Sequence, residues 1–211
     1  MLTAGLKVRA AVLLAGDSPK TNIATVLKDM LVVCADGAYV WAREQGITPD
    51  IFVGDLDSLN APPQGAGEVI LHNADKDATD GELAVDCALS RGAESVAIYG
   101  GGGGRDDHYM GNLMLLARAA DAGAEAVMHT EYCEIHICKS LFQKYLKPGT
   151  TVSVVPFCGD AHILDTEGLK YALKSSTLKA GSTLGISNVV TDSRVRVEVA
   201  RGMALVYIVR G

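Results

Sequence analysis

The first 130 residues of the chain alternate between two hydrophobic patterns. Short apolar and β-branched runs, each typical of a buried strand, lie at residues 10–15, 31–35, 51–53, 68–71, 95–99 and 126–129. Between them, apolar residues at helical spacing predict helices at residues 38–45, 80–91 and 107–122. Strands that alternate with helices predict an α/β domain, doubly wound around a mostly parallel sheet.

The pattern changes near residue 131. Helical periodicity gives way to short runs typical of strands, at residues 134–138, 150–155, 162–164, 169–173, 195–200 and 204–209. The clearest of them alternates buried-type Val195, Val197 and Val199 with polar residues, while Arg201-Gly202 reads as a turn. We therefore expect two domains, an α/β domain at residues 1–130 and a smaller all-β, sandwich-like domain at residues 131–211.

The amino-acid composition limits the classes of protein to which the chain can belong. With 48% hydrophobic and 21% charged residues among 211, the chain is globular rather than disordered. A formal net charge of −6 disfavours nucleic acid or an anionic membrane as the main partner. The five cysteines form no CxxC pair and their number is odd, which is not typical of a disulfide framework. Because signal-like and membrane-spanning segments are also missing, we expect a cytoplasmic protein.

Acidic residues follow the predicted strands. Asp36-Gly37 comes directly after residues 31–35, and Asp55 and Asp57 follow residues 51–53. If strand geometry persists, Asp55 and Asp57 point to the same side, where a hard divalent cation such as Mg²⁺ would offset their repulsion. The alternative is a polar turn with solvated aspartates.

A second acidic segment precedes the helix predicted at residues 80–91. Thr79 and Glu82 have the spacing of a capping box, so Asp80 has an ordinary interpretation as a residue of the first helical turn. Asp75 and Asp77, however, exceed what one helix cap requires. This segment therefore adds candidate ligands to those at the strand ends.

Five consecutive glycines, residues 100–104, lie between a predicted strand and a predicted helix. Glycines let the backbone approach a ligand closely and offer N–H groups to phosphate oxygens. Arg105 could grip a phosphate with its fork of donors, and His108 could either contact a phosphate or support the loop. A low-complexity linker is the alternative interpretation of the glycines.

Carboxylates that converge with such a loop at the carboxyl ends of parallel strands suit a site for Mg²⁺ and a nucleotide. The residues thus indicate phosphoryl transfer, pyrophosphoryl transfer or phosphate ester hydrolysis, and go no further. Four blocks together resemble the thiamine pyrophosphokinase family, in its order and near its spacing. They are residues 35–37, residues 48–58, residues 75–80 and residues 104–108, and residues 181–188 also resemble the family's substrate-contacting loop.

This resemblance implies transfer of the pyrophosphoryl group of ATP to the hydroxyl of thiamine, giving thiamine diphosphate and AMP, by a homodimer. It implies that the α/β domain binds ATP and Mg²⁺ and that the all-β domain binds thiamine. The metal residues would be Asp55, Asp57 and Asp80. Residues around the nucleotide and the reacting groups would be Asp36, Gly37, Asp77, Thr79, Gly103, Gly104, Arg105, Asp107 and His108.

The resemblance also concerns the thiamine site, and the residues leave several alternatives for the chemistry. Ser187 and Asn188 would lie near the pyrimidine of thiamine, and Tyr171 is a guess for an aromatic partner. Either Asp80 or Asp107 could accept the hydroxyl proton. The acceptor could be another alcohol, such as a pterin, and the region around Ser187 would distinguish the two. A non-catalytic nucleotide or thiamine sensor is the third possibility, although all the acidic positions of the motif are present.

Overall fold

The computed structural model describes residues 7–56, 63–73 and 77–210. The chain divides into two compact units, Met1–Glu131 and Tyr132–Gly211, which we call the N-terminal and C-terminal units and describe separately. Within the described residues, no helix has both the length and the apolar content needed to cross a membrane.

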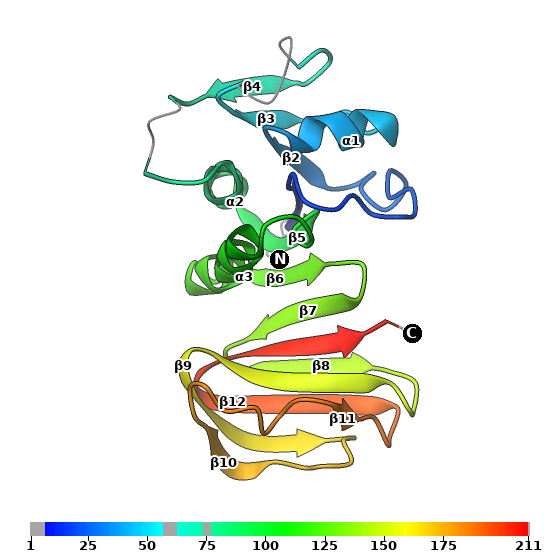
Figure 1. The fold of residues 1–211 in the computed structure, drawn as a ribbon, viewed down its shortest axis with the longest axis vertical. Coiled ribbons are helices and arrows are strands. Elements are labelled where there is room, and N and C mark those ends of the chain that lie inside the picture. The colour runs from blue at the N-terminus through cyan, green and yellow to red at the C-terminus, as the bar shows by residue number, and fades with distance from the viewer. Residues whose placement is uncertain (1–6, 57–62, 74–76, 211) are drawn as a thin grey trace, which may run out of the picture. The chain divides into compact units, whose positions relative to one another are not determined.

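The N-terminal unit is built on a parallel sheet (Figure 1). Its strands are β1 (Val8–Leu13), β2 (Leu31–Ala35), β3 (Ile51–Gly54), β4 (Glu68–Leu71), β5 (Ala93–Tyr99) and β6 (Glu125–His129). Their spatial order is β6-β5-β1-β2-β3-β4. The chain therefore moves outward from β1 to β4 and then returns to the other side of β1.

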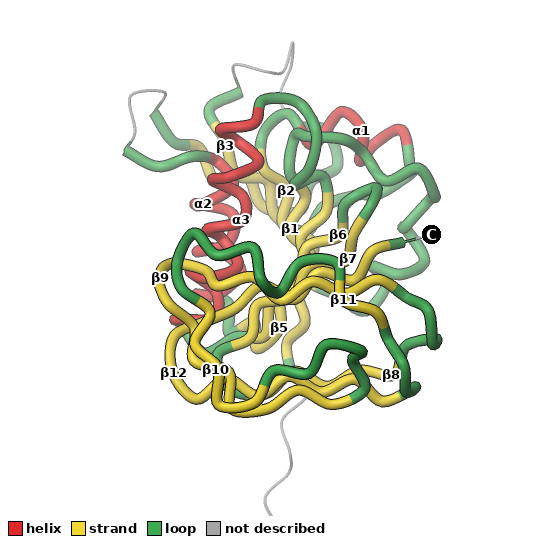
Figure 2. The backbone as a smooth tube through the Cα atoms, turned by 60° about the horizontal axis from the view of Figure 1, so that its bottom comes forward, coloured by secondary structure: helices red, strands yellow, loops and turns green. Residues whose placement is uncertain are grey.

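Helices cover both faces of this sheet. Figures 1 and 2 show α1 (Ala38–Glu44) on one face and α2 (Asp80–Ser90) with α3 (Asp106–Asp121) on the other. On the α1 face, Leu13 and Cys34 pack with Trp41 in one buried cluster. Because side chains alternate along a strand, Val12 and Val33 point to the opposite face, and both are fully buried. Burial on both faces explains the nearly continuous apolar runs of these strands.

The C-terminal unit is an antiparallel sandwich organised by two long strands. Its strands are β7 (Cys133–Cys138), β8 (Leu141–Tyr145), β9 (Thr151–Glu167), β10 (Lys174–Leu178), β11 (Asn188–Val189) and β12 (Arg194–Val209). The first half of β12 pairs with β8 and its second half pairs with β7, while β9 pairs with β12, β10 and β11. Residues from both halves, such as Val197 and Val206, share one core, so the halves pack as two layers.

The predicted fold class, a doubly wound α/β domain followed by an all-β one, is confirmed. Two predicted strand breaks are wrong, because residues 151–155 and 162–164 belong to the single strand β9, and Arg201-Gly202 lies inside β12. The register of the β9–β12 pair shifts between Arg201 and Met203, so the chain bends there without ending its ladder. Turn residues marked bends between layers rather than ends of strands.

Two further differences concern short strands. The predicted strand at residues 169–173 is wrong, because β10 begins at Lys174 and only Leu169 forms an isolated bridge, to Val190. The backbone of Tyr171 bonds instead to the side chain of Asn188. The strand β8 was missed, because only Phe142 among its residues is buried and its pattern is therefore weak.

Candidate active site

The carboxyl ends of β1 and β5 meet where the strand order of the N-terminal unit reverses. In open α/β sheets, ligands bind outside the carboxyl ends of the strands at such a switch point. The loop at residues 14–17 follows β1, and the glycine loop, residues 100–104, follows β5. The acidic segments after β2 and β3 lie on the same edge of the sheet, since these strands are parallel to β1.

Asp36 is buried at this edge, with 3% of its surface exposed. Its Oδ1 accepts a hydrogen bond of 3.1 Å from the N–H of Leu56. A Cβ on Gly54 would lie 2.7 Å from the Asp36 side chain, so glycine is needed at position 54 for close approach. Asp36 therefore fixes the backbone that carries Asp55. Burial, with a smaller contribution from the Asp36 charge, raises the pKa of the Cys34 thiol, which excludes a Cys34 thiolate near neutral pH.

Asp55 and Asp80 are both half-buried, at the end of β3 and the first position of α2. Thr79 caps α2, because its Oγ1 accepts the N–H of Glu82 at 3.2 Å. Asp77 is exposed just before this cap, while Asp57 and Asp75 lie outside the described residues. In the described part of the chain, no three His, Cys, Asp or Glu side chains gather closely enough to hold a metal.

The glycine loop is tied to the loop after β1 through its carbonyl groups. The N–H of Leu14 donates to the oxygen of Tyr99 at 2.8 Å, that of Gly16 to Gly100 at 2.9 Å, and that of Asp17 to Gly102 at 2.7 Å. Between Gly100 and Gly102, the carbonyl of Gly101 accepts a bond of 3.0 Å from Nδ2 of Asn112 on α3. Four successive carbonyl oxygens are thus bound to the protein.

The N–H groups of this loop are in a different situation. Within the described residues, those of Gly101 to Gly104 donate to no protein acceptor. Successive backbone N–H groups that have no acceptor in the protein form a site that favours anions. The N–H groups of the loop are thus available to an anion, and a phosphate site at Gly103 and Gly104 stays a prediction. The hydrogen bonds of the loop's carbonyls do not fit a low-complexity linker.

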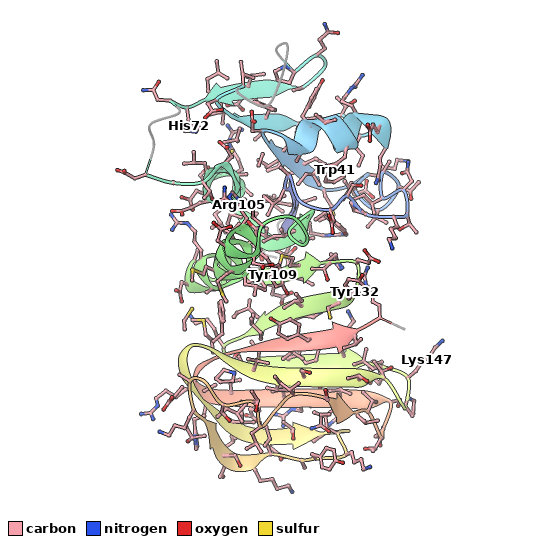
Figure 3. The ribbon with its side chains drawn as sticks, viewed as in Figure 1. Trp41, His72, Arg105, Tyr109, Tyr132 and Lys147 are labelled. Carbon is pink, nitrogen blue, oxygen red and sulfur yellow. The ribbon has the colours of Figure 1, made fainter. Side chains whose placement is uncertain are left out.

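Arg105, labelled in Figure 3, lies at the start of α3. It forms a two-pronged ion pair with Asp107. Nε of Arg105 lies 3.1 Å from Oδ1 of Asp107, and Nη2 lies 2.6 Å from Oδ2. Arg105 holds the pKa of Asp107 below its usual range, with help from the N–H of His108, which donates to Oδ1 at 2.9 Å. The two side chains are exposed, so solvent and incoming anions can reach the guanidinium.

Trp41 packs against the loop that follows β1. The residue is 7% exposed, and its Nε1 donates to the carbonyl of Leu14 at 2.9 Å. A Cβ on Gly100, which has φ of +71°, would lie 2.1 Å from that same carbonyl oxygen. Trp41 is thus a packing residue that fixes the end of β1 rather than a platform for a ligand.

The predicted thiamine residues lie in the C-terminal unit. Asn188 is 5% exposed, and its side chain accepts the N–H of Tyr171 at 3.0 Å and donates to the oxygen of Tyr171 at 2.7 Å. Ser187 is exposed with φ of +59°, and its N–H donates to Oγ of Ser153 at 3.0 Å. The ring of Tyr171 is exposed. Asn188 therefore holds the backbone that presents Tyr171 to solvent.

Sequence reasoning missed two parts of the site. The loop at residues 14–17 had a signal, since a turn follows an apolar run there, but nothing in the pattern indicated that it binds the glycine loop. Asn112 had no signal, because a single polar residue within an amphipathic helix is ordinary.

Comparisons with known proteins cover both units. The family model described as thiamin pyrophosphokinase, catalytic domain, matches residues 24–128, and that of the vitamin B1 binding domain matches residues 135–204. The thiamine pyrophosphokinase of Bacillus subtilis (strain 168) is 31% identical over 188 residues, which span 83% of this chain and 85% of that protein. A Caenorhabditis elegans relative, thiamin pyrophosphokinase 1, is 27% identical over 157 residues, or 70% of this chain and 65% of the relative.

Solved structures show the same similarity. The crystal structure of thiamine pyrophosphokinase from Bacillus subtilis superposes with a TM-score of 0.83 at 26% identity, covering 95% of this chain and 99% of that one. Thiamin pyrophosphokinase from Candida albicans superposes with a TM-score of 0.81 over 97% of this chain and 90% of that one. At 15% identity, the second match shows the fold alone.

Proposed function

Because this chain belongs to the thiamin pyrophosphokinase family, we propose that it transfers the pyrophosphoryl group of ATP to the hydroxyl of thiamine, giving thiamine diphosphate and AMP. The observation that carries the proposal in the structure is the glycine loop, in which the carbonyls of Gly100 to Gly102 are bound and the N–H groups of Gly101 to Gly104 face no acceptor in the described residues. The comparisons support neither a pterin acceptor nor a non-catalytic sensor.

The two units take separate substrates in this proposal. The match of the catalytic-domain model supports ATP binding by the N-terminal unit, and the match of the vitamin B1 model supports thiamine binding by the C-terminal unit. Ser187 and the exposed ring of Tyr171 would contact thiamine. Asn188 would act through the backbone of Tyr171, which it holds by two hydrogen bonds.

Asp55, Asp57 and Asp80 would hold Mg²⁺. The chemistry of these donors fits a hard cation, since all are carboxylates, and Asp36 fixes the adjoining backbone at Leu56. When bound, the ion would neutralise charge on the polyphosphate and polarise its phosphorus–oxygen bonds. Gly37 and Asp77 border this region, and we keep them as candidate nucleotide contacts.

The chain's own groups would act as follows. N–H groups of the glycine loop bind phosphate oxygens, while the guanidinium of Arg105 donates hydrogen bonds to the polyphosphate. His108 lies beside the polyphosphate. The hydroxyl oxygen of thiamine attacks the β-phosphorus of ATP, and AMP leaves. A carboxylate, that of Asp80 or Asp107, would accept the hydroxyl proton of thiamine.

The test is to incubate the purified protein with ATP, Mg²⁺ and thiamine and to separate nucleotides and thiamine esters by chromatography. Thiamine diphosphate should appear in step with AMP, stop on addition of EDTA and resume with excess Mg²⁺. ADP with thiamine monophosphate would instead show transfer of the γ-phosphoryl group, and a lack of thiamine-dependent turnover would refute the proposal.

We also propose a homodimer in the cytoplasm that binds no nucleic acid. The dimer rests on the family resemblance, and the location rests on the number and spacing of the cysteines. Size-exclusion chromatography with light scattering should give about twice the 22.1 kDa mass of one chain. A mass of one chain at micromolar concentration would contradict the dimer.

A further inference from the structure

The orientation of the glycine loop depends on what its carbonyls contact. In a planar trans peptide, the C=O of one residue and the N–H of the next point in opposite directions. A hydrogen bond that holds one carbonyl therefore also aims the next N–H group. The bond from Gly16 to the Gly100 oxygen aims the N–H of Gly101, and the bond from Asp17 to the Gly102 oxygen aims the N–H of Gly103.

The peptide group between Gly101 and Gly102 is held by a side chain instead. The oxygen of Gly101 accepts its bond from Nδ2 of Asn112, at 3.0 Å. Asn112 lies half-buried on α3, and its Oδ1 is 3.7 Å from the position that a Cβ on Gly81 would take. The amide thus stands between the glycine loop and the first turn of α2, where Asp80 lies. Of the three bonds that aim successive N–H groups, only this one comes from a side chain.

We propose that Asn112 is a positioning residue, which aims the N–H of Gly102 at a phosphate oxygen by holding the carbonyl of Gly101. It touches neither substrate and acts through the loop. The inference deepens the proposed function, since the phosphate it concerns belongs to the polyphosphate of ATP. Without the amide donor, the peptide between Gly101 and Gly102 can rotate, and its N–H is no longer fixed in direction.

The test replaces Asn112 by leucine, which has a similar size and no donor. We expect the KM for ATP and the Kd for inorganic tripolyphosphate, measured by calorimetry, to rise about tenfold, while the KM for thiamine stays within twofold. Asn22→Leu is the matched control, because Nδ2 of Asn22 also donates to a backbone carbonyl, that of Gln45 at 2.8 Å, away from the loop. It should leave all three constants within twofold.

Other readouts separate positioning from mere stability. A purely structural role for Asn112 would lower the melting temperature and the folded fraction but leave the Kd for tripolyphosphate unchanged, and that result overturns the proposal. A parallel rise in the KM for thiamine overturns it too. Asn112→Gln, which keeps the donor, should recover part of the affinity for tripolyphosphate. If Asn112→Leu does not fold, Asn112→Ala is judged by the same Kd.

The two proposals can fail separately. If the unmodified protein forms no thiamine diphosphate, the proposed function fails, yet binding of tripolyphosphate to Asn112→Leu still decides the role of Asn112. If the unmodified protein forms thiamine diphosphate and Asn112→Leu binds tripolyphosphate equally well, only the positioning role is refuted.

Discussion

Buried polar side chains in both units hold backbone rather than each other. Asp36 accepts the N–H of Leu56, and Asn188 binds both the N–H and the oxygen of Tyr171. Such groups are costly to bury unless they are hydrogen-bonded, so each position depends strongly on its side chain. Residues that the family resemblance marks for ligands thus also have structural roles, and experiments must separate the two.

Arg105→Lys should raise the KM for ATP about tenfold, because an ammonium group lacks the planar fork of a guanidinium. Arg118→Lys is a matched control, since Arg118 on α3, the helix that Arg105 precedes, forms a similar fork with Asp86, with Nε 2.5 Å from Oδ1 and Nη2 2.7 Å from Oδ2. Steady-state kinetics of both variants give the KM for ATP. Equal changes of this KM in the two variants would contradict a role of Arg105 in nucleotide binding.

Asn188→Ala should lower the free energy of unfolding by about 2 kcal/mol, because it leaves two backbone groups of Tyr171 without partners. Ser187→Ala should change stability by less than about 0.5 kcal/mol, since the N–H that bonds to Ser153 remains, but should raise the KM for thiamine. Urea denaturation and thiamine kinetics measure the two effects. An Asn188→Ala protein of unchanged stability would contradict the structural role.

At the scale of elements, the glycine loop and the loop after β1 act as one unit. Their backbone bonds extend the pairing of β1 with β5 beyond the last residues of both strands. The sequence predicted the loop and its phosphate chemistry from composition alone. It could not predict this pairing, because residues 14–17 and 100–104 are far apart in the chain and no local pattern records their contact.

Gly100→Ala should destabilise the protein far more than Gly104→Ala does. Both residues have positive φ, but a Cβ on Gly100 would lie 2.1 Å from the backbone oxygen of Leu14, whereas a Cβ on Gly104 meets nothing within 4 Å. We expect a loss of about 1 kcal/mol for Gly104→Ala and at least about 3 kcal/mol for Gly100→Ala. Denaturant titrations of the two proteins should show this order; the reverse order would argue against the loop geometry.

In the molecule as a whole, each of the two units is stabilised by a different kind of packing. The N-terminal unit packs helices on both faces of a parallel sheet, while the C-terminal unit encloses one core between layers that share β9 and β12. Glu134, on β7, is partly buried with His136 and Lys144, and His136 Nε2 lies 2.5 Å from its Oε1. These contacts lower the pKa of Glu134 to about 2, so its ionised form stabilises the folded C-terminal unit.

Acid should therefore weaken the C-terminal unit through Glu134. The carboxylate stabilises the folded state fully above pH 4.5, its ordinary pKa, and loses that contribution as the pH falls toward 2. This loss amounts to about 3 kcal/mol. Urea titrations at pH 6 and pH 3 measure how far the free energy of unfolding falls between the two pH values. This fall should be smaller for Glu134→Gln than for the unmodified protein. Glu167→Gln removes a carboxylate that is 40% exposed and pairs with Arg194 and Arg196, so it should change that fall less than Glu134→Gln does.

The sequence was enough to predict the fold class, most elements of the N-terminal unit, and which residue types stand at the strand ends. It could do so because the period of apolar residues reports burial, and because carboxylates, glycines and an arginine carry their chemistry wherever they fold. The folded chain was needed to show that Asn112 binds the carbonyl of Gly101, that Asn188 binds Tyr171, and that β9 and β12 bend without ending. These contacts join distant residues, and the spacing along a chain does not encode which donor meets which acceptor.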